Sequence, residues 1–155
     1  MRILFVCTGN TCRSPLAEAI ARHIVAERRI PDVEVASAGT SAWQDAPASD
    51  GALLVALEHG VHLGEHRARQ LSAELVREAD LVLVMGAHHL DRVEALGGEG
   101  KSYMLTDYAS RVQDARQVSD PFGGDLDVYR TTFTELEREI SMVLDRIVHE
   151  RSGRT

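Results

Sequence analysis

The stretch FVCTGNTCRSPLAEA, residues 5–19, decides which fold the sequence can form. An apolar run begins at Ile3 and continues into the start of this stretch. The end of the stretch overlaps residues 16–24, where leucine or isoleucine recurs at every fourth position. An unbroken apolar run is typical of a strand buried on both faces, and the fourfold spacing is typical of an amphipathic helix. Ser14 and Pro15 suit the first positions of that helix, with the serine as its N-cap. The stretch therefore predicts a buried strand, a short loop and a helix in direct succession.

The rest of the chain alternates apolar runs with helical patterns. Further strands are predicted at 33–36, 81–85 and 102–105, and further helices at 51–58, 87–96 and along a final segment from 133 to 147. Strands that alternate with helices form a mostly parallel sheet, and right-handed crossovers place helices on both of its faces. We therefore expect a three-layer, doubly wound α/β fold. Ligands of such sheets bind beyond the carboxyl ends of the strands, which is where the loop after Val6 lies.

Bulk composition limits the class of protein. A length of 155 residues suits one domain, residues 1–155, and the net charge of −7 argues against a general nucleic-acid surface. No apolar run approaches the length of a membrane span, and the N-terminal residues lack the cleavage region of a signal peptide. Two cysteines cannot build a disulfide scaffold. We therefore expect a monomeric cytoplasmic protein that binds neither nucleic acid nor membrane.

The loop CTGNTCRS, residues 7–14, has the features of an anion-binding site. A short loop between a buried strand and a helix N-terminus turns backbone N–H groups inward, and the helix dipole adds positive potential. Gly9 supplies conformational freedom where a curled loop needs a positive φ, and Arg13 supplies a planar fork for two phosphate oxygens. No Gly-Lys-Ser/Thr sequence follows, so the loop is not a nucleotide-binding Walker loop.

Cys7 stands at the start of this loop, so its sulfur is expected beneath a bound anion. The positive surroundings that attract phosphate also favour thiolate over thiol, and Ser14 can donate a hydrogen bond to that thiolate. A thiolate that faces phosphorus is a nucleophile, which predicts phosphoryl transfer to Cys7 without a metal. Cysteine is also a common small apolar core residue, and a C-x5-R pattern alone is weak. The position between a buried strand and an amphipathic helix favours the nucleophile.

The leaving group of such a transfer needs a proton. One carboxylic acid can supply it and can then activate the water of the second step. The candidates by composition are Asp107, Asp120, Asp125 and Asp127. Pro121 stiffens the chain beside Asp120, but the residues alone do not decide among the four.

Several segments resemble those of a known family, the low-molecular-weight protein tyrosine phosphatases. FVCTGNTCRSPLAEA resembles the family's signature, DPFGG resembles its acid loop, and SAGT and HRARQL resemble further family segments. The likeness runs in order along nearly the whole chain. It implies a sheet of four parallel strands flanked by helices on both faces, with Cys7 as nucleophile, Arg13 as phosphate clamp and Asp120 as general acid. It also implies that Ser37 and His66 brace the loop.

The resemblance also bears on the substrate. Family members directed at tyrosine usually carry an aliphatic residue at the position of Thr11, whereas the bacterial protein-arginine phosphatases carry threonine in CTGNTCRSP. The Thr11 hydroxyl can hydrogen-bond a guanidinium, and Phe122 can stack on its flat face. The residues expected to contact the substrate are Thr8, Gly9, Asn10, Thr11, Cys12, Ser14 and Phe122. We therefore expect hydrolysis of phosphoarginine in phosphorylated proteins, with phosphotyrosine as the alternative.

Two other classes of protein are less well supported. A thiol-dependent arsenate reductase needs further cysteines downstream, and this chain has two in all. A phosphate-binding module needs neither a nucleophile nor an acid. The role of the second cysteine stays open, because Cys12 could form a protective disulfide with Cys7 or pack beneath the loop.

The histidines do not predict a metal site. His59, His62 and His66 stand at metal-like intervals, but two glycines break the helix that would align them. His88 and His89 are expected at a solvated helix start. We therefore expect no metal and no cofactor.

Overall fold

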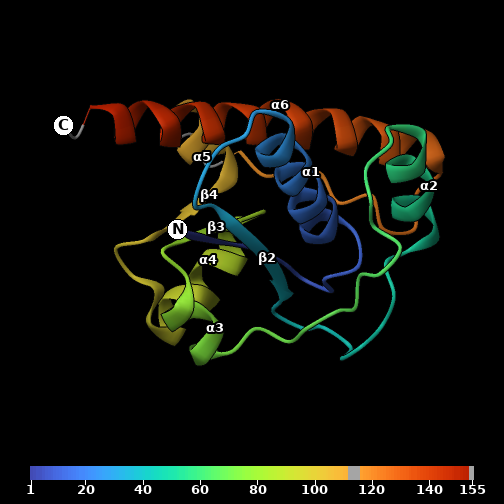
Figure 1. Cartoon of the computed structure of the whole chain (residues 1–155). Coiled ribbons are helices and arrows are strands. Elements are labelled where there is room, and N and C mark those ends of the chain that lie inside the picture. Colours follow the sequence, from blue (N-terminus) through green and yellow to red (C-terminus); the bar gives the residue numbers. More distant parts are fainter. Residues whose placement is uncertain (112–115, 154–155) are drawn as a thin grey trace.

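The computed structural model describes residues 1–111 and 116–153, and within this part of the chain four parallel strands form a central sheet (Figure 1). The strands are β1 (Arg2–Cys7), β2 (Glu34–Gly39), β3 (Leu81–Val84) and β4 (Ser102–Met104). Their order in the sheet is β2-β1-β3-β4, and each neighbouring pair is parallel. The chain leaves the inner strand β1 for one edge and then returns to the other side, so the predicted doubly wound sheet is confirmed.

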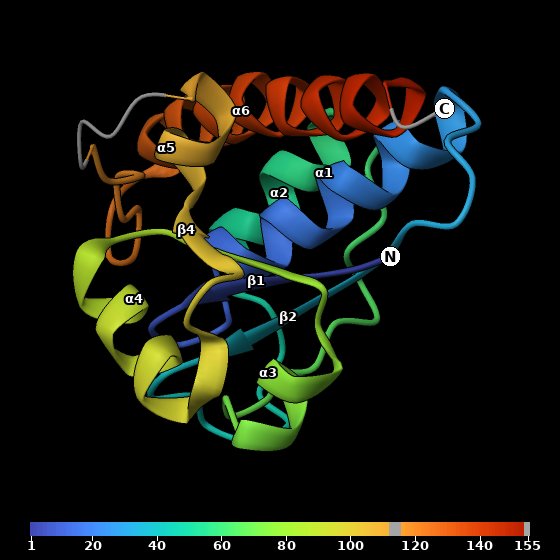
Figure 2. The ribbon, with the colours of Figure 1, turned by 90° about the vertical axis from the view of Figure 1, so that its left-hand side faces the viewer.

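Helices cover both faces of the sheet and complete three layers (Figure 2). On one side lie α1 (Arg13–Glu27), α2 (Asp50–Glu58), α5 (Leu105–Ser110) and the long α6 (Leu126–Ser152). On the other side lie α3 (Ala73–Glu78) and α4 (Ala87–Val93), which continues into a π-helical turn at Glu94–Gly98. The strands therefore bury both faces, as their unbroken apolar sequences predict.

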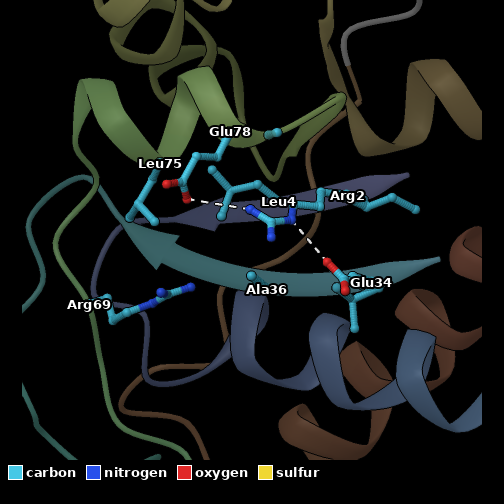
Figure 3. A pocket seen from close by; sticks show the side chains of 10 residues that line it. Arg2, Leu4, Glu34, Ala36, Arg69, Leu75 and Glu78 are labelled. Atoms are coloured by element: carbon cyan, nitrogen blue, oxygen red, sulfur yellow. Dashed lines mark hydrogen bonds and ion pairs between the residues drawn. The ribbon is translucent and has the colours of Figure 1, made fainter. Parts of the chain in front are cut away.

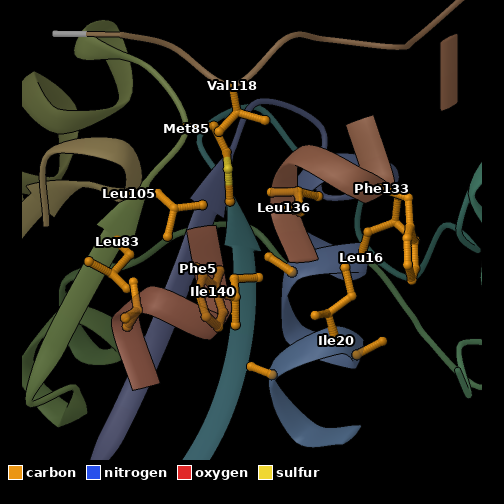
Figure 4. Packing of buried hydrophobic residues seen from close by; sticks show 14 of the residues in the cluster. Phe5, Leu16, Ile20, Leu83, Met85, Leu105, Val118, Phe133, Leu136 and Ile140 are labelled. Carbon is orange, nitrogen blue, oxygen red and sulfur yellow. The ribbon is translucent and has the colours of Figure 1, made fainter. Parts of the chain in front are cut away.

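The burial of β1 shows why its sequence is apolar throughout. Phe5 belongs to the core beneath α1 and α6, where it packs with Leu16 and Ile140 (Figure 4). Its neighbours Leu4 and Val6 belong to the second core, beneath α3 and α4. Successive side chains of a strand point to opposite faces, so alternate residues of β1 are buried in each of the two cores. The strand is thereby packed on both faces, and the loop that follows begins at its carboxyl end.

The structure differs from the sequence-based prediction in the bounds of β2, which runs to Gly39, and of α4, which ends at Val93, and it differs more clearly in three helices. Ser14 is not the N-cap of the first helix, because Cys12 precedes α1 and Ser14 lies inside its first turn. The short helix α3 was not predicted, although Ser72 caps it by accepting a hydrogen bond from the Leu75 amide at 3.2 Å. The short helix α5 was not predicted either, and it begins at Leu105, where the prediction still placed strand.

The C-terminal helix α6 is confirmed as the longest element, and it lies across α1, α2 and α5 (Figure 1). Asp125 caps it by accepting a hydrogen bond from the Val128 amide at 3.1 Å. The segment that leads into α6 carries Asp120, so the start of this helix fixes one end of the candidate acid loop. In the described ranges, no helix combines the length and the apolar character needed to cross a membrane.

Candidate active site

The loop between β1 and α1, residues 7–13, is held by its carbonyl oxygens. The Cys7 carbonyl accepts from the Thr40 amide, and the Thr8 carbonyl accepts from the Ser41 amide, at 2.9 Å each. The Asn10 carbonyl accepts from His66 Nε2 at 2.7 Å, and the Thr11 carbonyl accepts from the Ser49 amide at 2.9 Å. By contrast, the amides of residues 8–12 donate to no protein acceptor in the part of the chain that the structure describes. With the carbonyls bound from outside, these amides are left to face the middle of the loop. Such a ring of N–H groups at a helix N-terminus is an anion site.

Asn10 gives the loop its curl. Its φ is 57°, so the left-handed position predicted for Gly9 belongs to Asn10 instead. Asparagine tolerates this conformation, and here its buried side chain is bonded at both ends. Nδ2 donates to the hydroxyls of Ser14 (2.8 Å) and Ser37 (2.9 Å), and Oδ1 accepts from the Arg69 amide (2.8 Å). Asn10 therefore braces the loop from behind, together with Ser37.

The sulfur of Cys7 is buried and contacts the hydroxyl of Ser14, with 2.8 Å between Sγ and Oγ. The Asn10 amide nitrogen donates to Ser14 Oγ, and the single hydroxyl hydrogen of Ser14 has two acceptors within reach, the sulfur at 2.8 Å and the Ala38 carbonyl at 3.4 Å, of which the sulfur is the nearer. Ser14 lies in the first turn of α1, where the helix dipole favours negative charge. The Ser14 hydroxyl and the start of α1 therefore both lie beside the Cys7 sulfur.

Arg13 and Asp120 meet above the loop. Arg13, with a side chain only 6% exposed, donates from Nη1 to the Val118 carbonyl at 3.2 Å, and its Nη2 lies 3.5 Å from Asp120 Oδ2. The Asp120 side chain is 53% exposed, and its Oδ1 accepts from the Phe122 amide at 3.1 Å. This turn leaves the carboxylate facing the pocket and leaves the Phe122 ring, 74% exposed, at its rim.

One pocket brings together most of the predicted site. Its lining residues are Cys7, Thr8, Gly9, Thr11, Cys12, Arg13, Asp120 and Phe122. Of the predicted substrate contacts, Asn10 and Ser14 do not line it, because their side chains turn inward behind the loop. Two of the other candidate acids are engaged elsewhere. Asp125 caps α6, and Asp127 pairs with Arg130 at 2.8 Å.

Cys12 lies beneath the loop, and both cysteines are free thiols. Its Sγ is 3.3 Å from Ser49 Oγ and 3.4 Å from the Tyr129 hydroxyl. Burial, together with the hydrogen bond to Cys12, raises the pKa of Tyr129 to about 12, so this hydroxyl keeps its hydrogen. Cys12 therefore packs beneath the loop and also borders the pocket.

Two residues of the site were missed by the sequence-based prediction. A Cβ on Gly39, at the end of β2, would lie 2.4 Å from the Thr8 carbonyl oxygen, so only glycine lets β2 approach the loop. His89 was expected in solvent but is fully buried, and its Nε2 lies 2.8 Å from Thr8 Oγ1. The only signal for its burial was a spacing of four residues to Val93, which is also buried.

A pocket on the α3 side of β1 and β2 offers no comparable chemistry. Figure 3 shows Leu75 of α3 and Leu4 of β1 between these two elements, beside the charged side chains of Arg2 and Glu78. Arg2 is engaged there by carboxylates, with Nε 2.9 Å from Glu34 Oε2 and Nη1 3.7 Å from Glu78 Oε2. No cysteine lines this pocket, and the charge of Arg2 is neutralised within the protein.

The described residues contain no group of three or more histidines, cysteines or acids placed to hold a metal ion. His59 stacks on Phe133 with ring centroids 4.0 Å apart, whereas His66 holds the Asn10 carbonyl. These two histidines therefore serve separate structural contacts.

Known proteins match the chain over nearly its whole length. The family model of the low molecular weight phosphotyrosine protein phosphatases matches residues 2–152. A protein-arginine-phosphatase of Geobacillus stearothermophilus is 38% identical over 152 residues, which cover 97% of this chain and 98% of the relative. The low molecular weight protein-tyrosine-phosphatase Etp of Escherichia coli K12 is 37% identical over 138 residues, 88% of this chain and 87% of the relative.

A solved structure of the YwlE arginine phosphatase, a mutant whose active-site serine replaces cysteine and is phosphorylated, superimposes with a TM-score of 0.90. It shares 36% sequence identity and covers 98% of this chain and 99% of its own. The match in sequence and in fold thus includes the strand, the loop and the helix from which the site is built. The chain belongs to the low molecular weight phosphotyrosine protein phosphatase family.

Proposed function

We propose that the chain hydrolyses phosphoarginine in proteins through a phosphocysteine formed on Cys7. Its family membership makes it a protein phosphatase. The observation that carries the proposal is the arrangement around the sulfur. Cys7 precedes loop amides that have no acceptor among the described residues, lies 2.8 Å from the Ser14 hydroxyl oxygen, and shares one pocket with Arg13 and Asp120. The proposal includes action as a cytoplasmic monomer without a cofactor.

In the first step, the Cys7 thiolate attacks phosphorus in line with the bond to the leaving nitrogen. The S–P bond forms as the P–N bond breaks, and the electron pair of that bond stays on nitrogen. Loop amides and Arg13 bind the equatorial oxygens, where negative charge is concentrated. Asp120 gives its proton to the leaving nitrogen, so the guanidine group of the substrate arginine leaves as a neutral group and not as an anion.

In the second step, water attacks the phosphocysteine. Asp120, now ionised, removes a proton from that water, and the S–P bond breaks as the new P–O bond forms. The products are inorganic phosphate and the thiolate, which the Ser14 hydroxyl and the α1 dipole stabilise as a leaving group. The phosphorylated serine in the YwlE mutant supports phosphoryl transfer to the side chain at this position in that relative.

Preference for arginine over tyrosine rests on Thr11 and Phe122. Thr11 lines the pocket, and among the described residues its Oγ1 has one weak contact, with Cys12 Sγ at 3.8 Å, so the hydroxyl can bond a substrate guanidinium. Phe122 stands exposed beside the acid and can cover the guanidinium plane. The similarity to a protein-arginine-phosphatase over 97% of the chain supports the same preference.

Thr11→Ile is expected to shift the substrate preference toward phosphotyrosine. Isoleucine removes the hydroxyl and adds an apolar wall, so the ratio of kcat/KM for phosphoarginine over phosphotyrosine peptides should fall by about 10-fold or more. Thr11→Val is the matched control, because it removes the hydroxyl while nearly keeping the shape. If the ratio is the same in the parent and in both variants, Thr11 does not determine the preference.

Hydrolysis of phosphotyrosine is the second candidate function. The 37% identity to Etp supports it, and Phe122 can pack against a phenyl ring as well as a guanidinium. The parental kcat/KM on matched phosphoarginine and phosphotyrosine peptides decides between the two. A parental ratio in favour of phosphotyrosine would replace phosphoarginine as the proposed substrate.

Cys12→Ser is expected to make oxidative inactivation harder to reverse. Both thiols border one pocket, so a peroxide-oxidised Cys7 can condense with Cys12 to a disulfide, which dithiothreitol reduces. Without Cys12, oxidation of Cys7 proceeds to acids that thiols do not reduce. Activity is measured after peroxide and then dithiothreitol. Equal recovery in the parent and the variant would leave Cys12 as a packing residue.

A further inference from the structure

His89 is a buried imidazole that the two steps above do not use. It lies in the first turn of α4 with no exposed surface, while its neighbour His88 is exposed. Burying a polar ring has a cost that its hydrogen bonds must offset. Only one of its two ring nitrogens has a partner among the described residues, since the buried Nδ1 has none. The partner of the single bonded nitrogen therefore indicates the role of the ring.

That bonded nitrogen holds the residue next to the reactive sulfur. His89 Nε2 lies 2.8 Å from Thr8 Oγ1, and Thr8 follows Cys7 directly. Thr8 lines the pocket and is exposed to it, so its side chain would otherwise be free to rotate. Its carbonyl is already fixed from the other side by the Ser41 amide at 2.9 Å. The bond to His89 fixes the side chain as well.

The turn that carries His89 also holds the acid loop. The Met85 carbonyl, at the end of β3, accepts the Val118 amide at 3.0 Å, and Arg13 donates to the Val118 carbonyl at 3.2 Å. At the next residue, a Cβ on Gly86 would lie 2.7 Å from the Gln117 amide oxygen. The segment from β3 to α4 therefore contacts the phosphate loop through His89 and the acid loop through Met85.

The lack of a partner for Nδ1 among the described residues indicates which tautomer the His89 ring adopts. If Nδ1 carried the hydrogen, a buried N–H would lack an acceptor, which is rarer and costlier than an unpaired lone pair. The hydrogen is therefore placed on Nε2, which donates to Thr8 Oγ1. The threonine oxygen accepts from the ring, and its own hydrogen stays available to a substrate oxygen in the pocket.

Burial is the main reason that the His89 ring stays neutral. Burial, followed by the positive charges of His88 and Arg13, lowers the pKa of His89 to about 4, against an opposing effect of Asp120. At neutral pH the ring therefore adds no positive charge beside the pocket. A neutral ring with one N–H is a fixed donor and not a general acid or base.

We infer that His89 is a positioning residue of this phosphatase, which acts through the Thr8 hydroxyl. The inference rests on the proposed function, because Thr8 matters for the reaction only if the pocket binds the phosphoryl substrate. His89 directs the Thr8 hydroxyl toward the pocket, and the turn on which it stands keeps that wall in register with the acid loop.

A double-mutant cycle tests the inference on kcat/KM for the peptide that the parent prefers. His89→Phe fills the ring space without a hydrogen bond, and Thr8→Val removes the hydroxyl with little change in shape. Each is expected to lower kcat/KM by about 10-fold, the effect of a lost hydrogen bond of about 1.4 kcal/mol. Because both remove the same bond, the double variant should lose little more than either one.

Three comparisons separate positioning from packing. His89→Gln offers an amide donor and should recover part of the loss, and His62→Phe, at an exposed imidazole that does not line the pocket, should keep kcat/KM within about 2-fold of the parent. Parental activity in His89→Phe, or losses that multiply in the double variant, would overturn the inference. If His89→Phe does not fold, the inference is tested by kcat/KM of the Thr8→Val and His89→Gln variants and by nitrogen NMR of the His89 ring.

Nitrogen NMR of the parent reads the bond without any activity. The His89 ring is expected to show its hydrogen on Nε2 at pH 7 and no titration above about pH 5, and Thr8→Val should shift its Nε2 resonance. A hydrogen on Nδ1, or an Nε2 signal that Thr8→Val leaves unchanged, would contradict the inference. A parent that hydrolyses neither phosphopeptide would instead overturn the proposed function, even with these resonances as expected.

Discussion

Cys7→Ser is expected to abolish turnover while the fold survives. A serine hydroxyl at this site is a far weaker nucleophile than a thiolate, and a phosphoserine is a far poorer substrate for attack by water. Loss of a covalent nucleophile elsewhere costs on the order of 10⁴-fold or more in kcat, and we expect a loss of that order here. Oxygen is smaller than sulfur and can still accept the Ser14 hydrogen bond, so packing should change little.

The measurement is steady-state hydrolysis of p-nitrophenyl phosphate and of phosphopeptides, with thermal unfolding of each variant. Cys12→Ser is the matched control, because it makes the same atomic change at a sulfur that faces Ser49 and Tyr129. It should lose less than about 10-fold in kcat. A Cys7→Ser variant with parental turnover would exclude Cys7 as the nucleophile.

Asp120→Asn is expected to slow hydrolysis in a way that depends on the leaving group. Asparagine cannot give or take the proton, so kcat/KM on phosphopeptides should fall by about 10²- to 10⁴-fold. The loss should be clearly smaller on p-nitrophenyl phosphate, because nitrophenolate is a stable anion that leaves without a proton. Because the second step also needs Asp120, there as the base that activates water, phosphocysteine should accumulate in this variant.

Asp127→Asn is the control for Asp120, since Asp127 is exposed and pairs with Arg130 away from the pocket. Its activity should match that of the parent. Asp120 also lies 3.5 Å from Arg13, so it has an alternative role in orienting the guanidinium. A loss of equal size for good and poor leaving groups would favour that alternative and would contradict the role of general acid.

The architecture could be predicted because its strongest signals are local. The apolar run of β1 and the fourfold spacing in α1 reflect burial on two faces and on one face, and both are visible within short windows. The helices α3 and α5 span six residues each, less than two turns, so no apolar period can be recognised in them. They are supported by packing that is remote in sequence, since Val76 of α3 joins the core with Leu4 of β1, and Leu105 of α5 joins the core with α6.

The site could be predicted in part, because its reactive residues lie in one continuous loop. Cys7 and Arg13 are six positions apart in a recognisable context, whereas Asp120 could be chosen only through the family resemblance. The positive φ of Asn10 depends on contacts with Ser37 and Arg69, which are remote in sequence. The burial of His89 is marked in the sequence only by its spacing of four residues to Val93, and its contact with Thr8 is likewise remote in sequence.

Rapid acid quench of the Asp120→Asn variant during turnover tests the central claim most directly, because it captures the intermediate on the sulfur. Mass spectrometry of the quenched protein should show one phosphoryl group per chain, and peptide mapping should place it on Cys7. The group should be absent when the same variant also carries Cys7→Ala. Turnover with no phosphorylated protein, or with the phosphoryl group on another residue, would contradict transfer through Cys7.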